Sequence, residues 1–257
     1  MIMKIIDVSA ANAAEIGFFC YMSKRKTQGY RLKSGWLVKR FGEGLRIKML
    51  ELPERGFIEY IPGEYAWRAI EAKGYMAIHC LWIVGKSKGK GFGLTLLEAC
   101  CEDARRAGMN GVVMVVSDRT WLAGRGVLEK AGFTCVDTAP PSFFLMVKAF
   151  GKGPKPKFSG DWEAKAAEFG KGLTVVRTDQ CPYIEDATNL ALACAAKAGV
   201  KHRVLTLNSA AEIREKSPSA YGTFGLVFNG RLISYSYLLE KDLLPLLKSG
   251  LAGFPRP

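Results

Sequence analysis

The most informative segment of the sequence reads Tyr75-Met76-Ala77-Ile78-His79-Cys80-Leu81-Trp82-Ile83-Val84-Gly85-Lys86-Ser87-Lys88-Gly89-Lys90-Gly91-Phe92-Gly93. Its first part, Tyr75 to Val84, is almost continuously apolar, which predicts a strand covered on both faces. Its second part alternates glycine with lysine. Small and apolar side chains then recur at helical spacing up to a terminating glycine: Leu97, Cys100, Cys101, Ala104, Ala107 and Gly108. The segment therefore predicts a strand that leads through a glycine-rich turn into a helix.

This glycine-rich turn has the features of a phosphate-binding loop. Glycine lets the backbone approach a ligand closely, and the first N–H groups of a helix are unpaired and carry partial positive charge. Two common phosphate loops do not fit the spacing. A Walker A loop that ends in Gly85-Lys86-Ser87 would need a glycine where Cys80 stands. A dinucleotide fingerprint that starts at Gly91 and Gly93 would need a small residue in place of Leu96.

The loop resembles the pyrophosphate loop of the GNAT-type N-acetyltransferase superfamily. In that pattern Gln or Arg is followed by two residues, Gly, one residue, and Gly or Ala; here Lys88 takes the first position and Gly91 and Gly93 the last two. Residues Leu128 to Phe133 are similar to the segment that ends a later helix of the family. The resemblance covers most of residues 1–150 and implies an α/β (α+β) fold with a mixed sheet of the GNAT type.

The resemblance also implies the reaction and the cofactor. The chain is expected to be an N-acetyltransferase that moves an acetyl group from acetyl-CoA to an amine acceptor. The end of the central strand, Trp82, Ile83 and Val84, would pair with the pantetheine arm of the cofactor. The pyrophosphate would be held by the loop residues Lys88, Gly89, Lys90, Gly91, Phe92 and Gly93. Leu128 stands where many members of the family have a tyrosine that protonates the departing thiolate, so no such acid is expected here.

An amine attacks only when it is neutral, so transfer to a lysine-like amine benefits from a general base. Glu59 interrupts an apolar strand predicted over residues 57–61, and Glu64 follows a Pro-Gly turn. Either carboxylate could reach the acceptor amine, directly or through water. The alternatives are a solvent-facing strand residue for Glu59 and a loop carboxylate for Glu64. His79, within the central strand, is either a base or a hydrogen-bonded core residue.

The C-terminal part is expected to be a separate, smaller α/β domain. Glycine, proline and lysine dominate the segment after residue 150, which predicts a linker over residues 151–170 and a second domain over 171–257. The predicted order of strand, helix, strand, helix, hairpin and helix resembles a thioredoxin-like fold, and more specifically the YoaP-like domain found after some acetyltransferases. Cys181 begins the first helix, where a thiolate is stabilised, but Ile184 occupies the place of a resolving cysteine. A monothiol redox or sensing role therefore competes with a role in shaping the substrate site or in dimerisation.

Composition narrows the class of protein. The chain has 257 residues, of which 49% are hydrophobic and 24% charged, which is typical of a folded globular protein. Its least polar stretch spans residues 74–85, well short of the roughly 18 residues that a transmembrane helix needs. Seven cysteines without a Cys-x-x-Cys pair, and two histidines, predict reduced thiols in the cytoplasm and no metal site.

The net charge of +13 favours an anionic partner. Nine basic residues gather between Lys24 and Lys48, which can be a solvated helix face, a surface for the acceptor or, last in preference, a nucleic-acid surface. We expect an amine-bearing small molecule or peptide as acceptor, no nucleic acid, no membrane, and a possible homodimer. The alternative function is a non-catalytic protein that binds CoA or senses redox state through one thiol.

Overall fold

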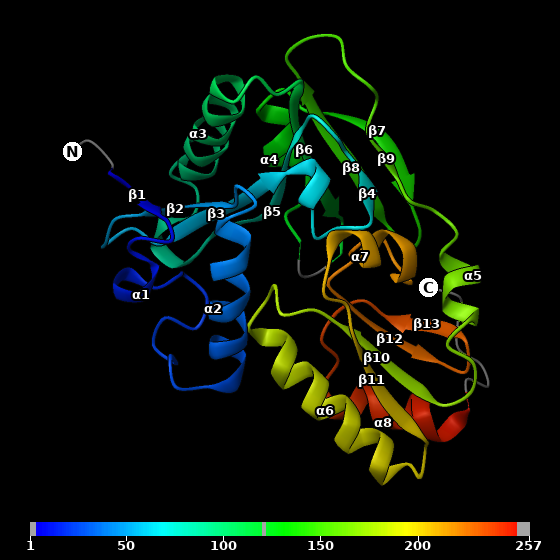
Figure 1. Cartoon of the computed structure of the whole chain (residues 1–257). Helices are drawn as coiled ribbons and strands as arrows, with labels where there is room; N and C mark the ends of the chain where they lie inside the picture. The colour runs from blue at the N-terminus through cyan, green and yellow to red at the C-terminus, as the bar shows by residue number, and fades with distance from the viewer. Residues whose placement is uncertain (1–3, 120–121, 251–257) are drawn as a thin grey trace.

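The N-terminal 150 residues build a seven-stranded mixed sheet in the computed structural model, which describes residues 4–119 and 122–250 (Figure 1). The strand order is β1-β2-β3-β5-β6-β8-β7. The strands are β1 (Ile5–Val8), β2 (Arg46–Leu50), β3 (Gly56–Pro62), β5 (Met76–Ile83), β6 (Gly111–Ser117), β7 (Thr134–Ala139) and β8 (Phe143–Ala149). The mixed sheet expected from the sequence is therefore present, although β7 was not predicted.

Four α-helices accompany this sheet. They are α1 (Ala13–Ile16), α2 (Gln28–Phe41), α3 (Phe92–Arg106) and α4 (Arg125–Lys130). Helix α3 packs on β3, β5 and β6, and its apolar side chains form one core with them. The capping-box spacing Asn12-Ala13-Ala14-Glu15 predicts a helix with Ile16, Phe19 and Cys20 on one face, but α1 stops at Ile16, because Gly17 takes a positive φ of 78°. A second helix is predicted over Trp36 to Phe41, and α2 begins at Gln28, about two turns earlier.

The central strand β5 leaves its neighbour β6 halfway along its length. Only Met76, Ala77 and Ile78 pair with β6. At the next residue the register with β3 shifts, because Glu59 lies opposite Cys80 whereas Tyr60 lies opposite Ile78. His79 is thus the extra residue of a β-bulge, which bends a strand and increases its twist. Beyond the bulge β5 and β6 diverge and leave a cleft between them.

The strand predicted over residues 75–84 is confirmed, but its burial is not uniform. The half paired with β6 is buried, as expected for a strand covered on both faces. The half beyond the bulge lines the cleft instead, and Trp82 is 43% exposed. For the half of β5 beyond the bulge, the prediction that both faces are covered was wrong. A strand that lines a cleft can be as apolar as a strand in the core, so composition does not distinguish the two.

The C-terminal unit is a four-stranded sheet of order β11-β10-β12-β13 flanked by helices (Figure 1). Strand β11 is parallel to β10, whereas β12 is antiparallel to both β10 and β13. Its elements are β10 (Leu173–Arg177), α6 (Tyr183–Lys197), β11 (His202–Thr206), α7 (Ala210–Lys216), β12 (Phe224–Phe228), β13 (Arg231–Ser234) and α8 (Glu240–Ser249). The hairpin predicted at Asn229-Gly230 is present, with positive φ at both residues.

The segment 151–170 contains two short elements where only a linker was expected. Strand β9 (Lys157–Phe158) pairs with β4 (Ile70–Glu71), and α5 (Trp162–Ala167) follows. Phe158 is 7% exposed, and its ring centroid lies 6.3 Å from that of Trp162. These two aromatic rings anchor a segment whose glycine, proline and lysine content had suggested only a connection.

The two units are packed into one body. A single cluster of buried side chains includes Val113 and Phe143 of the first sheet and Val175 and Phe224 of the second. On the other side, α2 lies against the start of α6, where a Cβ at Gly29 would stand 2.1 Å from the carbonyl oxygen of Pro182. A side chain at this position would therefore push the units apart.

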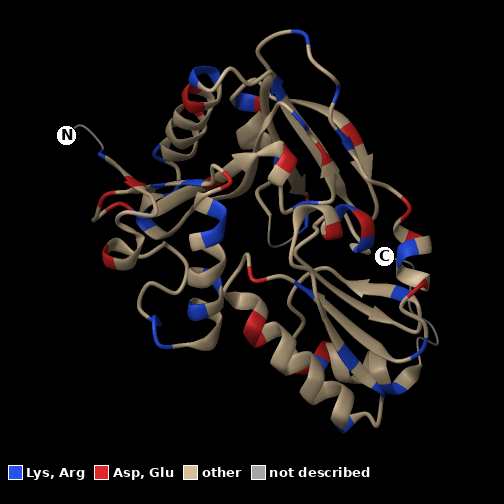
Figure 2. Cartoon of the chain, in the orientation of Figure 1, with Lys and Arg blue, Asp and Glu red and all other residues tan. Residues whose placement is uncertain are grey.

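Charged residues are distributed over both units (Figure 2). Several of these charges form ion pairs at the surface, such as those of Lys4 with Glu51 and of Lys197 with Glu240. Across the described residues, every helix is too short or too polar to span a bilayer.

Candidate active site

A cavity of about 450 Å³ lies where β5 and β6 diverge. Both units contribute to its walls, because residues of β5 and β6 face residues from the start of α6 and from the segment before β12. Its lining consists of Cys20, Phe57, Arg68, His79, Cys80, Leu81, Trp82, Met114, Leu122, Ala123, Cys181, Tyr183 and Tyr221. Most of these side chains are apolar or aromatic, and none of them is a carboxylate. The cavity has the size typical of a small-molecule site.

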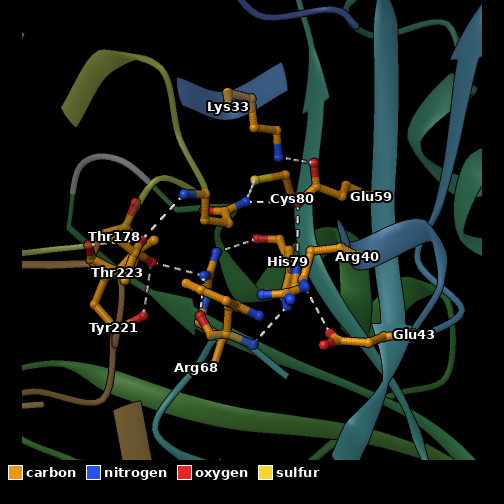
Figure 3. A network of polar contacts seen from close by, with 12 residues as sticks. Lys33, Arg40, Glu43, Glu59, Arg68, His79, Cys80, Thr178, Tyr221 and Thr223 are labelled. Carbon is orange, nitrogen blue, oxygen red and sulfur yellow. Dashed lines mark hydrogen bonds and ion pairs between the residues drawn. The ribbon is translucent and has the colours of Figure 1, made fainter. Parts of the chain in front are cut away.

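A buried polar cluster lies beside this cavity (Figure 3). Glu59 of β3 is at its centre: Lys33 Nζ of α2 lies 2.5 Å from one carboxylate oxygen. The other oxygen lies 3.2 Å from His79 Nδ1 and accepts a hydrogen bond of 2.8 Å from Gln180 Nε2. Lys33, Glu59, His79 and Gln180 are all nearly inaccessible to solvent. The cluster therefore joins α2, β3 and β5 to the C-terminal unit.

The partners of Glu59 keep it ionised. Burial alone would raise the pKa of this carboxyl, but the Lys33 ammonium and the hydrogen bond from His79 outweigh burial and hold the pKa at about 2. Burial lowers the pKa of His79 to about 4, so the imidazole is neutral at pH 7. His79 Nε2 accepts a hydrogen bond of 2.9 Å from the Trp67 amide, which places the imidazole proton on Nδ1, toward Glu59. Both ring nitrogens of His79 are thus engaged, as in a hydrogen-bonded core residue.

Arg68 lines the cavity and is 1% exposed. Its Nη1 donates to the Trp67 carbonyl at 2.7 Å and to Thr223 Oγ1 at 2.8 Å, and its Nη2 donates to the His79 carbonyl at 2.5 Å. Arg68 thus donates to the backbone carbonyl of the bulged residue. Within the described part of the chain, Arg68 has no carboxylate partner and its Nε has no acceptor.

Three cysteines from distant segments face the cavity. Cys20, Cys80 and Cys181 line it together, and all three are free thiols. Burial raises the pKa of each, and the neighbouring thiols raise those of Cys20 and Cys181 further, the latter to about 12. The backbone amide of Tyr183 lowers the pKa of Cys181, as expected at a helix start, but burial outweighs it. Among the described residues, no group of three or more histidine, cysteine or acidic side chains is arranged to hold a metal ion.

The two carboxylates suggested by the sequence lie in different places. Glu59 is in the buried cluster, and its neighbours His79 and Cys80 line the cavity, whereas Glu59 itself is not part of the lining. Glu64 is in a short 3₁₀ turn (Gly63–Tyr65) that follows Pro62, and Pro62 pairs with Met76 at the closed end of β5. The structure therefore brings Glu59 close to the cleft and places Glu64 at the opposite end of the strand. A role of either carboxylate as a general base stays a prediction.

The glycine-rich loop lies at the open end of β5. Gly89 and Gly91 have φ values of 78° and 83°, and a Cβ at either position would meet nothing within 4 Å. In the described structure, the backbone amides of Gly89, Lys90 and Gly91 have no protein acceptor, and those of Phe92 and Gly93 begin helix α3. The loop thus has consecutive backbone N–H groups without an acceptor in the described structure, and a Cβ at Gly93 would lie 3.9 Å from Ile83 Cγ1 of β5.

The three lysines of the loop add positive charge, and one of them forms an ion pair. All three, Lys86, Lys88 and Lys90, are exposed. Lys90 Nζ lies 2.7 Å from a carboxylate oxygen of Glu54, and this ion pair lies at the surface. Positive side chains around unpaired backbone amides are the electrostatic features of an anion site.

The basic segment from Lys24 to Lys48 is only partly a solvated helix face. Lys33 is in the buried cluster, Lys48 is 9% exposed and pairs with Asp7 and Asp103, and Arg40 pairs with Glu43. Several of these charges therefore hold the fold together.

Sequence reasoning missed Arg68, Lys33 and Gln180 as members of this site. Their partners are far apart in the sequence: 155 residues separate Arg68 from Thr223, and 121 separate Gln180 from Glu59. One available signal was a single arginine within the otherwise uncharged segment Tyr65 to Ile70.

Comparisons with known proteins identify the family. No family model matches the chain. The uncharacterized N-acetyltransferase YoaP of Bacillus subtilis (strain 168) is 31% identical over 240 residues, which cover 92% of this chain and 95% of YoaP. The PaiA N-acetyltransferase of Thermoplasma acidophilum, in complex with coenzyme A, has 16% identity, a TM-score of 0.40, and coverage of 58% of this chain and 100% of its own. A GNAT-family acetyltransferase of Brucella melitensis, in complex with acetyl-CoA, has 18% identity, a TM-score of 0.39, and coverage of 60% and 92%. The similarity to YoaP along nearly the whole of both sequences means that this chain belongs to the family of the N-acetyltransferase YoaP.

Proposed function

We propose that the cleft between β5 and β6 binds acetyl-CoA and transfers its acetyl group to an amine in the adjoining cavity. One observation carries this proposal. The strands diverge directly after three paired residues, a cavity of about 450 Å³ lies there, and a loop with free backbone amides follows the end of β5. An elongated ligand with an anionic end fits this arrangement.

The loop residues fit the pyrophosphate of the cofactor. Unpaired amides of Gly89, Lys90 and Gly91, followed by the first turn of α3, are suited to phosphate oxygens. Open space at the Cβ positions of Gly89 and Gly91 leaves room for close approach. Lys88, at the first position of the motif, supplies a point charge without the planar donors of glutamine or arginine. We assign Lys88, Gly89, Lys90, Gly91, Phe92 and Gly93 to this contact.

The remaining cofactor contact falls on β5. Beyond Ile78 the edge of β5 that faces β6 has no strand partner, so the backbone of Trp82 and Ile83, and of Val84 just after the strand, can pair with the amide groups of a pantetheine arm. When bound, the thioester supplies an activated acetyl group. The chain itself orients the two reactants, and the apolar walls of the cavity keep water from competing with the amine.

We assign Glu59 a positioning role in this reaction, as an alternative to the general base predicted from the sequence. A carboxylate with a pKa of about 2 and three hydrogen-bond donors is a weak base at pH 7. Its contacts instead fix His79, the bulged residue that turns β5 away from β6. Glu59 would then act by holding the cleft open.

We propose that the C-terminal unit is thioredoxin-like and closes the acceptor side of the cavity. Its sheet order and the directions of its strands are those of a thioredoxin-like core. Cys181, Tyr183 and Tyr221 reach the cavity from this unit. The raised pKa of Cys181 and the isoleucine at position 184 favour a wall of the substrate site over a redox centre. The free thiols are consistent with a cytoplasmic location, and a homodimer stays a prediction.

The proposal is tested with acetyl-CoA and a panel of amines. Acetyl-CoA is expected to raise the unfolding temperature of the protein, and a reactive amine is expected to release free thiol from it. A variant with Trp82 replaced by alanine should keep the fold, because this side chain is half exposed, and should lose turnover, because the side chain forms part of the cavity wall. Acetyl-CoA binding without thiol release across a broad panel would instead favour the non-catalytic CoA-binding alternative. No effect of acetyl-CoA on the unfolding temperature would contradict the proposal.

A further inference from the structure

We infer that the acceptor is an amine that carries a carboxylate, as an amino acid does, and that Arg68 binds this carboxylate. This inference rests on the proposed function, because it assigns a substrate class to the same cavity. It starts from an imbalance of charge inside the protein. Buried charges in proteins are normally paired, since an isolated charge away from water is costly.

The buried groups around the cavity have one positive charge in excess. The Lys33 ammonium and the Glu59 carboxylate neutralise each other at 2.5 Å, and His79 is neutral. The guanidinium of Arg68 carries the remaining positive charge. Its three protein acceptors are two carbonyl oxygens and one hydroxyl oxygen, none of which carries a charge. Within the described part of the chain, its counter-ion is missing.

Arg68 also has unused hydrogen-bond donors. A guanidinium has five N–H groups, and the contacts to Trp67, Thr223 and His79 use three of them. Nε is buried and has no acceptor among the described residues. Its N–H and one N–H of Nη2 are left, and two such donors suit the two oxygens of a carboxylate. Arg68 is held in place by the other three contacts, so its geometry is already set before a ligand binds.

The shape and lining of the cavity define the rest of the acceptor. Beside Arg68 the walls are apolar or aromatic: Leu81, Trp82, Met114, Leu122, Tyr183 and Tyr221. The Tyr221 ring also supports the guanidinium, with 5.0 Å between the guanidinium carbon and the ring centroid. The cavity of about 450 Å³ accommodates a small molecule. A carboxylate at Arg68 and an apolar side chain against these walls describe an amino acid or a close analogue.

The charge of Arg68 also discriminates between acids and simple amines. A cation in a low-dielectric site disfavours a second positive charge nearby, so Arg68 lowers the pKa of an ammonium group that enters the cavity. The acceptor carboxylate offsets this repulsion at the moment of binding. Simple cationic amines lack the carboxylate and therefore meet only the repulsion.

The experiment compares matched acceptors at saturating acetyl-CoA. Leucine and phenylalanine are each paired with their methyl ester and with the amine that lacks the carboxylate, isoamylamine and phenethylamine, and thiol release is followed. We expect kcat/KM to be about 100-fold higher for the acids, which is the size of effect that charge-assisted hydrogen bonds produce. In Arg68→Met this preference should fall below about fivefold. Thr223→Val, which removes a neutral partner of Arg68 and keeps the charge, should retain the preference.

A binding measurement on the wild-type protein covers the case in which Arg68→Met does not fold. N-acetyl-leucine and N-isoamylacetamide are titrated into the CoA complex, and only the acid is expected to bind. Equal binding or equal turnover of partners with and without the carboxylate would overturn the inference. The inference would also be overturned if acetyl-CoA binds but no acid in the panel binds or reacts. In that case the assignment of acetyl-CoA as the acetyl donor would stand. Loss of acetyl-CoA binding itself would instead contradict the proposed function.

Discussion

Replacing Glu59 with glutamine is expected to reduce the free energy of unfolding by about 3 to 5 kcal/mol at pH 7. The side chains of Lys33 and Glu59 are only 4% and 2% exposed, so their ion pair lies outside the reach of solvent. In Glu59→Gln the ammonium keeps its burial and loses its counter-ion. The new amide group must also turn its NH₂ toward Lys33, or toward the donors of His79 and Gln180. The cost therefore combines an unpaired charge with at least one clash between donors.

Urea denaturation measures this cost, and a second variant isolates its cause. In Lys33→Met/Glu59→Gln neither charge of this ion pair remains, and the amide oxygen still accepts from His79 or Gln180. We expect this double variant to recover to within about 2 kcal/mol of the wild type, because apolar replacement of a buried ion pair is often close to neutral. A loss below about 1 kcal/mol in the single variant, or a double variant no more stable than the single one, would refute this reasoning.

The same pair of variants separates the two roles considered for Glu59. If Glu59 positions His79 and the bulge, the double variant, whose stability is restored, should regain most of the acetyl-transfer activity. If Glu59 is the general base, the double variant should fold and stay inactive. Activity is compared with stability in the same preparations, so that an unfolded fraction is not mistaken for a loss of catalysis.

Three further predictions concern protonation and burial. Since burial lowers the pKa of His79 to about 4, the unfolded chain binds a proton that the native state does not, and stability should fall as pH decreases from about 6.5 to 4. The total is about 3 kcal/mol, and His79→Gln should flatten this part of the pH profile in urea denaturation. Cys181, whose pKa is raised to about 12, should be alkylated by iodoacetamide far more slowly than the exposed Cys135, as measured by mass spectrometry; equal rates would contradict the raised pKa of Cys181. Asp103→Asn should cost about 3 kcal/mol at neutral pH, because this buried carboxylate accepts from Tyr60 and pairs with Lys48, and the difference from wild type should shrink as pH falls toward 2.

Local signals in the sequence were sufficient for the strand, loop and helix over residues 75–108. An apolar run, a group of glycines and a helical repeat each depend on residues adjacent in the chain. The same holds for the Asn229-Gly230 turn and for Ser209, whose hydroxyl accepts from the Glu212 amide at the start of α7. These features could be predicted because the interactions that stabilise them are within a few residues of one another.

The buried cluster and Arg68 could not be predicted in the same way. Glu59 receives hydrogen bonds from α2, β5 and the segment before α6, and composition contains no information about which of these elements meet. Cys181 illustrates the same limit for electrostatics. A helix start favours the thiolate locally, whereas the wall of the cavity around it raises the pKa, and only the tertiary structure determines which effect is larger.

Titration calorimetry with acetyl-CoA tests the central claim, that free amides around Gly91 hold the cofactor beside β5. The wild-type protein and two variants, Gly91→Ala and Gly91→Trp, are compared. Alanine and tryptophan would both have to adopt the positive φ of position 91, which is unfavourable for any residue with a side chain. A methyl group at this position meets nothing within 4 Å, so the alanine variant controls for backbone strain. The account predicts that one acetyl-CoA binds per wild-type chain. Gly91→Ala should bind it with an affinity within about tenfold of the wild type, a difference of about 1.4 kcal/mol at most, and a folded Gly91→Trp should not bind it. Undiminished binding by Gly91→Trp, or none by the wild type, would contradict it.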